Sequence, residues 1–212
     1  MTEKDFRVRF AVTLAIGLLM TATASAQDRM PEIPAAQQTE AQKKASEEFL
    51  AARKVPVFGP FVPLLRSPQL MLNASNMGLY LRYNSVIPLK LSEFTILLTA
   101  REWDQQLEWQ IHEPIALKAG LDPAVVEAVR EGRRPDTMGE EETLVYAFST
   151  ELHRNKSVSD TTYARVIKTF GEQGAIDLAG INGYYTLLAM TLNMARTALP
   201  PGVAPPLPAL VK

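Results

Sequence analysis

REWDQQLEWQIHEP, residues 101–114 of the 212-residue chain, holds both tryptophans and one of the two histidines among several carboxylates. We expect Asp104 to cap a helix that ends at Gly120. Glu108 and His112 are four residues apart on this helix and therefore lie on one face. A carboxylate at that spacing can orient an imidazole and raise its pKa, so the pair could transfer a proton near neutral pH. The same spacing also fits an exposed pair that only stabilises the helix.

The rest of residues 57–199 also has the pattern of packed helices. Apolar residues recur at spacings of three and four, and no long run alternates between apolar and polar residues. The helix-start signals are Ser67 before Pro68, Pro88 with Ser92, Asp122 before Pro123, a capping box of Thr137 with Glu140, and Ser159 or Asp160. The helix that starts at Ser159 or Asp160 is expected to end near Gly171, and a last, apolar helix is expected at about residues 175–197. The sequence thus predicts an all-α fold, a compact bundle of six or seven helices.

The first residues have the pattern of a secretory signal peptide. Cationic residues precede an apolar run at residues 10–20, and the small residues Ala24 and Ala26 suit cleavage before Gln27. The run is about half as long as a membrane-spanning helix requires; an uncleaved amphipathic anchor is the alternative. We therefore expect residues 1–26 to be removed and the mature protein to be exported, periplasmic or secreted, without stable membrane insertion.

Two further segments flank the predicted domain at residues 57–199, which is long enough for one sizeable core. Residues 27–56 are polar and rich in alanine, which predicts a tether followed by one helix. Residues 200–212 include five prolines within nine residues, so we expect an extended tail there.

Composition excludes several classes of function. The formal net charge is -1, so no overall positive field would attract nucleic acid or an anionic membrane. The chain contains no cysteine. Disulfides, thiolate zinc sites and cysteine nucleophiles are therefore excluded, and any chemistry must use oxygen and nitrogen groups.

Several segments, taken in order, carry a likeness to a known family. They are LYLRY at residues 79–83, EFTIL at 93–97, EWQIHEPIALKAGL at 108–121, FGEQGAIDL at 170–178 and GYY at 183–185. With these segments the chain resembles the carboxymuconolactone decarboxylase family over roughly residues 60–197. The resemblance implies an all-α domain with the alkyl hydroperoxide reductase D-like fold, which assembles into trimers or hexamers with active sites near the subunit contacts.

The redox branch of this family uses a glutamate, a Cys-x-x-Cys pair and a histidine as a proton relay. The resemblance places Glu93 at the relay glutamate and His112 at the relay histidine, but Gln105 and Glu108 at the two cysteines. Neither residue can form a disulfide, so thiol peroxidase activity is not expected. The decarboxylase branch needs no such pair. The resemblance there implies cofactor-free decarboxylation, or related lyase chemistry, on a small unsaturated carboxylic acid or lactone.

Within this hypothesis His112 donates the proton, Glu108 orients the His112 imidazole and Glu93 assists the proton relay. Arg101 or Arg82 would hold a carboxylate or stabilise enolate-like charge, since a guanidinium suits two-point recognition of an anion. The other candidates for substrate contact are Tyr83, Gln105 and Trp109. No cofactor and no metal ion are expected.

Two alternatives remain open from the sequence. The first is a non-catalytic helical oligomer that binds a small ligand or another protein. The second is metal-assisted chemistry, with Glu108 and His112 as two ligands and Glu93 as a third.

Overall fold

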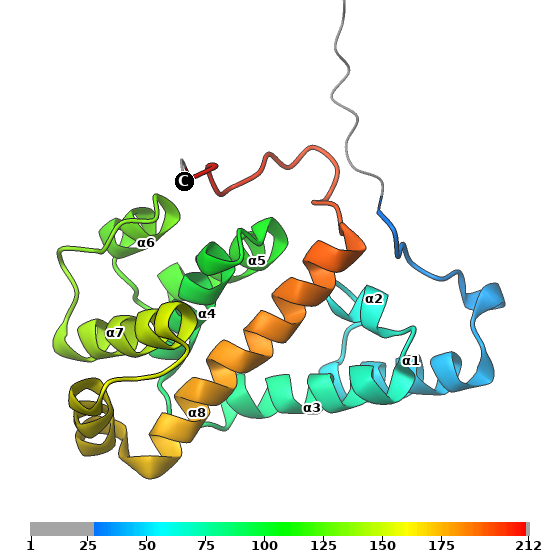
Figure 1. Ribbon diagram of the computed structural model, residues 1–212. Coiled ribbons are helices and arrows are strands. Elements are labelled where there is room, and N and C mark those ends of the chain that lie inside the picture. Colours follow the sequence, from blue (N-terminus) through cyan, green and yellow to red (C-terminus); the bar gives the residue numbers. More distant parts are fainter. Residues whose placement is uncertain (1–27, 211–212) are drawn as a thin grey trace, which may run out of the picture.

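The computed structural model describes residues 28–210, and this part of the chain consists of helices and connecting segments without a β-strand (Figure 1). The helices are the short 3-10 helix η1 (Ala35–Gln37) and α1 (Glu40–Arg53), α2 (Phe61–Leu64), α3 (Pro68–Tyr83), α4 (Leu89–Glu102), α5 (Gln106–Lys118), α6 (Pro123–Arg130), α7 (Glu140–Asn155) and α8 (Asp160–Ala195). The predicted all-α fold is confirmed for these residues. The predicted signal peptide, residues 1–26, and the last two residues of the tail lie outside them.

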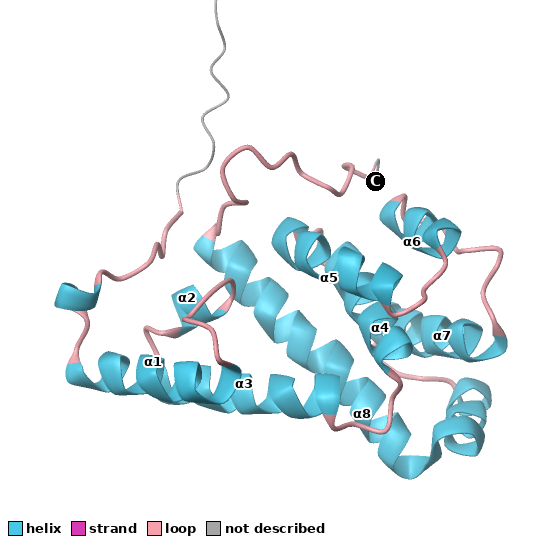
Figure 2. Ribbon diagram, turned by 180° about the vertical axis from the view of Figure 1, so that it is seen from behind, coloured by secondary structure: helices cyan, strands magenta, loops and turns pink. Residues whose placement is uncertain are grey.

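The central helix of the fold is α4. It packs against α5, α7 and α8, and most of its side chains are buried. The long helix α8 crosses the molecule, with α4, α5 and α7 on one side of it and the pair α1 and α3 on the other (Figures 1 and 2). Phe94 and Leu97 of α4 and Leu178 and Ile181 of α8 are fully buried members of the core. Glu93 of α4 is buried among them and therefore needs polar partners.

Several predicted helix starts are found in the structure. Helix α3 begins at Pro68 directly after Ser67, and α6 begins at Pro123 after Asp122. The Asp122 carboxylate accepts a hydrogen bond from a backbone N–H of the first turn of α6, as an N-cap should. The hydroxyl of Ser159 caps α8 in the same way.

Gly171 divides α8 into two segments. Its backbone, with φ 72° and ψ 179°, lies outside the helical region in a conformation that suits glycine. The two helices that the sequence predicts here, one ending near Gly171 and one at about residues 175–197, correspond to these segments. The second segment is the one that crosses the core (Figure 1).

Two predicted N-caps are wrong. Asp104 has a left-handed backbone, with φ 49°, and Gln105 caps α5 because its side-chain oxygen accepts a hydrogen bond from the N–H of Leu107 (2.8 Å). Helix α7 begins after Gly139 and not after Thr137. In both cases the residue closest to the helix takes the capping position, and the better cap-forming residue lies one or two positions too early.

The segments that flank the domain both pack on it. Helix α1 lies along α3 and buries Phe49 in the core. The tail, which has no helix among its described residues, passes across α5 (Figure 1). Its Leu207 is buried and exchanges two hydrogen bonds with the Gln106 side chain. Within residues 28–210, no helix combines the length and the apolar character needed to cross a bilayer.

Candidate functional site

A cavity of about 270 Å³ lies where α1, α2, α3, α5 and α8 approach one another. Its apolar wall consists of Phe58, Phe61, Ile111, Ile115 and Leu188. Its polar side chains are Arg53, Arg82, Tyr83, Glu108, His112, Tyr184 and Tyr185. The volume is close to the lower end of the range for small-ligand pockets, and convergent polar groups in an apolar cavity are typical of a binding or catalytic site.

Four charged side chains form a chain of contacts at this cavity. Nη2 of Arg82, on α3, donates to Oε1 of Glu93 at 2.9 Å. The other Glu93 oxygen, Oε2, lies 2.6 Å from Nδ1 of His112. Nε2 of His112 lies 3.5 Å from Oε2 of Glu108. Glu93, His112 and Glu108 are 0%, 4% and 2% exposed, so positive and negative groups alternate through the interior across α3, α4 and α5.

The two carboxylates favour the charged form of His112. Burial alone lowers the pKa of His112, but its contacts with the carboxylates of Glu108 and Glu93, together with their negative charges, raise this pKa above its ordinary value. The two carboxylates therefore favour the protonated imidazole, with Nδ1 held by Glu93. Such an imidazolium can act as a general acid.

Glu93 remains a carboxylate for the complementary reason. Burial raises the pKa of Glu93, but the hydrogen bonds and positive charges of His112 and Arg82 lower it below its ordinary value. Glu93, which is buried behind the residues that line the cavity, thus holds Arg82 and His112 in fixed orientations.

Two tyrosines from α8 complete the polar wall. The ring of Tyr185 meets the His112 ring edge to face, with centroids 5.1 Å apart, and Tyr184 meets Tyr185 in the same way. Burial raises the pKa of both Tyr184 and Tyr185, so both keep their phenolic protons. Gly78 of α3 permits the approach of α8, because a Cβ atom there would collide with the hydroxyl of Tyr184.

One polar atom of the site has no partner. Oε1 of Glu108 is buried and accepts no hydrogen bond from any described residue. A buried carboxylate oxygen without a donor costs free energy, and such atoms in native proteins call for an explanation. Glu108 lines the cavity, so a bound molecule with a hydrogen-bond donor would remove this cost.

Arg53 is a cavity residue that the sequence did not suggest. It ends α1, and its Nε and Nη2 donate to Oγ and to the carbonyl oxygen of Ser75, at 2.7 and 2.8 Å. Its guanidinium lies over the rings of Phe61 and Phe49, 4.7 and 5.4 Å from their centroids. Burial lowers the pKa of Arg53, although a guanidinium remains charged at any physiological pH.

The structure brings together five of the residues selected from the sequence, namely Arg82, Tyr83, Glu93, Glu108 and His112. Tyr83 lies at the cavity mouth with 60% of its surface exposed.

The other three residues lie elsewhere. Arg101, Gln105 and Trp109 do not line the cavity. Arg101 is on α4, because the break at residues 103–105 separates it from α5. It donates to the carbonyl oxygens of Arg130 and Pro208, both at 3.0 Å, and Gln105 donates to Oδ1 of an asparagine on α8.

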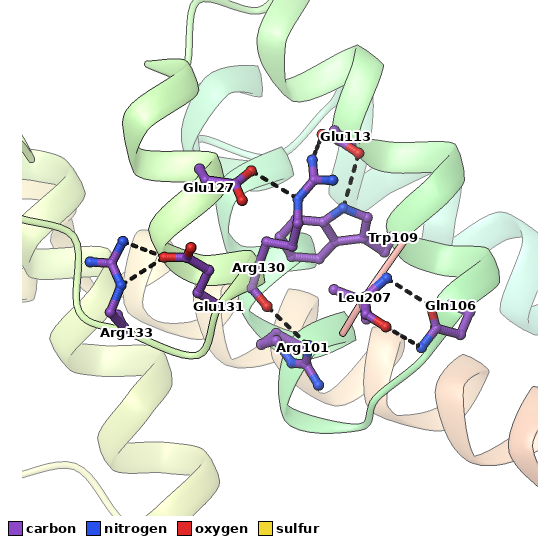
Figure 3. Close-up of polar contacts among 9 residues, drawn as sticks. All are labelled: Arg101, Gln106, Trp109, Glu113, Glu127, Arg130, Glu131, Arg133 and Leu207. Carbon is purple, nitrogen blue, oxygen red and sulfur yellow. Dashed lines mark hydrogen bonds and ion pairs between the residues drawn. The ribbon is translucent and has the colours of Figure 1, made fainter. Parts of the chain in front are cut away.

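Trp109 belongs to a network between α5 and α6 (Figure 3). Its indole Nε1 donates to Glu113 at 3.0 Å, and Arg130 forms ion pairs with Glu113 and Glu127. Trp109 is fully buried. Its contacts in the described chain are thus those of a core residue that joins two helices.

Among residues 28–210, no group of three or more histidine, aspartate and glutamate side chains has an arrangement that could hold a metal ion. The two nitrogens of His112 face different carboxylates, which suits proton transfer along the chain of contacts.

Comparison with known proteins adds no assignment, since no family model and no curated protein matches the chain.

Proposed function

We propose that this protein is a cofactor-free acid–base enzyme of the carboxymuconolactone decarboxylase type. Its reaction would be decarboxylation, or related lyase chemistry, of a small unsaturated carboxylic acid or lactone. The observation that carries the proposal is the position of His112, which is held between two buried carboxylates, Glu93 and Glu108, beside a small cavity. The site offers a proton donor, a proton acceptor and cations around one cavity.

The proposed reaction uses these groups in order. The carbon–carbon bond to a carboxylate breaks, carbon dioxide leaves, and the bonding electron pair passes into a conjugated carbonyl group of the substrate. The resulting enolate-like anion takes a proton at carbon from His112. Water then returns a proton to the imidazole, so the cycle consumes one proton for each carbon dioxide released.

The proton that moves is the one on Nε2. Nδ1 of His112 forms a short contact of 2.6 Å with Glu93. This contact holds the Nδ1 proton and fixes the imidazole ring. Nε2 is 3.5 Å from Glu108, too far for a strong hydrogen bond. The Nε2 proton is therefore less restrained and lies on the side of the cavity, where a substrate can accept it.

Glu93 is a positioning residue in this mechanism, whereas Arg82 acts on the substrate. Glu93 fixes the imidazolium and lowers the free energy of its charged form. Arg82 lines the cavity, and its positive charge stabilises the negative charge that develops on the substrate carbonyl.

The family assignment rests on the segments of sequence likeness and on the absence of cysteine, which leaves the decarboxylase branch and not the thiol-dependent one. We propose a trimer or hexamer. Exposed apolar side chains along α8, which are Ile176, Met190 and Met194, support a subunit contact there. Light scattering coupled to gel filtration measures the assembly directly, and a monomer at micromolar concentration would contradict it.

Export is part of the proposal and rests on the signal pattern of residues 1–26. Mass spectrometry of the protein recovered after expression in a bacterium with a periplasm tests it. A mature chain that begins near Gln27 is expected.

Carbon dioxide release from 4-carboxymuconolactone tests the reaction. The wild-type mature chain should release it, and His112→Gln should abolish release while its helical circular dichroism stays unchanged. The matched control is His153→Gln, because His153 is the other histidine of the chain and lies on α7, where it contacts Thr99. This control should retain turnover.

The binding alternative predicts a different result. Saturable binding of small acids without any product, by a folded protein, would favour a non-catalytic module over the proposed enzyme. Full turnover by His112→Gln would remove His112 from the mechanism.

A further inference from the structure

We infer that Arg53 binds a carboxylate of the substrate that is retained in the product, so that the cavity accepts small carboxylates with an apolar, unsaturated body. The inference deepens the proposed function and depends on it for the reaction that follows binding. The binding step itself can be tested without turnover.

Arg53 is the cation of the cavity that has no acidic partner. Arg82 directs both Nε and Nη2 to Oε1 of Glu93, at 3.3 and 2.9 Å, so its charge is already matched. Arg53 donates to the uncharged Ser75 and forms no ion pair with any described residue. The unmatched positive charge of the cavity is therefore at Arg53, where an anion that enters would bind.

The charge around the cavity supports one bound carboxylate. With His112 protonated, as the proposed reaction requires, Arg53, Arg82 and His112 are three cations beside the two carboxylates Glu93 and Glu108. One positive charge is left over. Because the two cavity tyrosines keep their phenolic protons, one retained carboxylate on the ligand would balance the site.

The surroundings of Arg53 prepare it for this contact. The rings of Phe49 and Phe61 lie against its guanidinium, and the two hydrogen bonds to Ser75 fix its direction. Partial burial strengthens an ion pair with a carboxylate, since water screens it less. A guanidinium already fixed in place loses little side-chain entropy when the ligand binds.

The apolar wall selects the body of the ligand. Phe58, Phe61 and Leu188 line the same cavity as Arg53. A ligand carboxylate at Arg53, which belongs to α1, leaves the other end of a short molecule to face Glu108 and His112 on α5. The partnerless Oε1 of Glu108 could accept a hydrogen bond there.

Sorbate, an unsaturated six-carbon monocarboxylate, is a suitable probe, and 2,4-hexadien-1-ol is its uncharged counterpart. Titration calorimetry of the mature protein should show saturable sorbate binding and markedly weaker binding of the alcohol. Arg53→Gln should weaken sorbate binding roughly 10- to 100-fold, the range for a lost charged hydrogen bond. Arg53→Lys should give an intermediate affinity, because it keeps the charge without the two-point contact.

Two controls separate charge recognition from general damage. Arg165→Gln removes an exposed arginine on α8 and should leave sorbate affinity unchanged. Affinity for the alcohol should be equal in wild type and Arg53→Gln, with equal circular dichroism. If Arg53→Gln proves unstable, Arg53→Lys and Ser75→Ala test the same contact, because Ser75→Ala removes only the hydroxyl that directs Nε.

The inference is overturned if Arg53→Gln or Arg53→Lys binds sorbate as tightly as wild type, or if the wild type does not prefer sorbate to the alcohol. These outcomes are distinct from failure of the proposed reaction. Loss of sorbate affinity in Arg53→Gln without any carbon dioxide release by wild type would support the Arg53 contact and contradict the decarboxylase. Carbon dioxide release by wild type together with unchanged sorbate affinity in Arg53→Gln would support the decarboxylase and contradict the Arg53 contact.

Discussion

Nδ1 of His112 lies 2.6 Å from Oε2 of Glu93, across the contact between α5 and α4. The two residues are 19 positions apart in the sequence, and both are almost completely buried. The contact forms only when the two helices are packed. The stability of the fold and the protonation of the site therefore depend on the same pair.

Glu93→Gln should destabilise the protein and abolish turnover. The change leaves Arg82 and His112 as buried cations without their shared carboxylate, which should lower the free energy of unfolding by about 3 kcal/mol. Urea denaturation measures this difference. The control Glu102→Gln, at an exposed position of the same helix, should change the free energy of unfolding by less than about 0.5 kcal/mol. Equal stabilities for the two variants would contradict a central role for Glu93.

The contribution of His112 to stability should fall at alkaline pH. Its pKa in the folded protein is raised, so the stabilisation is complete below the unfolded-state pKa of about 6.5 and is lost as pH rises through the folded pKa. Urea denaturation of wild type and His112→Gln between about pH 6 and 9 should show a stability difference that shrinks with pH. A difference that does not change with pH would mean that folding leaves the pKa of His112 unaltered.

Gly78→Ala should destabilise the protein by about 1–3 kcal/mol, as overpacking does. A Cβ atom there would collide with the Tyr184 hydroxyl and lie 3.0 Å from Nη2 of Arg53. The matched control is Gly183→Ala on α8, where a Cβ atom meets nothing within 4 Å. That change should stabilise the helix by about 0.5–1 kcal/mol. The melting temperatures of the two variants should shift in opposite directions from that of wild type. A stabilised Gly78→Ala would show that α8 can move away from α3.

Arg101→Gln should loosen the tail without affecting ligand binding. Arg101 donates to the carbonyl oxygens of Arg130 and Pro208, so its loss should cost about 2 kcal/mol of stability. Limited proteolysis should then cut residues 200–210 faster than in wild type. Sorbate affinity should stay the same, and a clear loss would return Arg101 to the list of substrate-binding residues.

Local signals in the sequence predicted most of the helices. The N-cap positions of Ser67, Asp122 and Ser159 are confirmed, and the side chains of Asp122 and Ser159 accept a hydrogen bond from the first turn of their own helix. Helix α2 was not predicted. It is only four residues long, and its Phe61 packs on Phe49 of α1, a tertiary contact that no local pattern shows.

The site was predictable only where its residues share a helix. Glu108 and His112 are neighbours by spacing on α5, whereas Glu93 was selected through the family likeness alone. Arg101 lies on α4, and the left-handed residue Asp104 separates it from Glu108 and His112 on α5. Arg53 reaches the cavity from a distant segment, so no spacing within one element could indicate it.

The position of α1 also decides where the functional unit begins. The likeness on which the proposed family assignment rests starts near residue 60, and the sequence before it predicts a tether and one helix outside the domain. Yet α1 contributes Phe49 to the core and Arg53 to the cavity. A chain shortened to residues 57–210 would retain the proton-transfer residues but would leave one side of their cavity open to water. The boundary drawn from sequence likeness is therefore not the boundary of the smallest chain that can work.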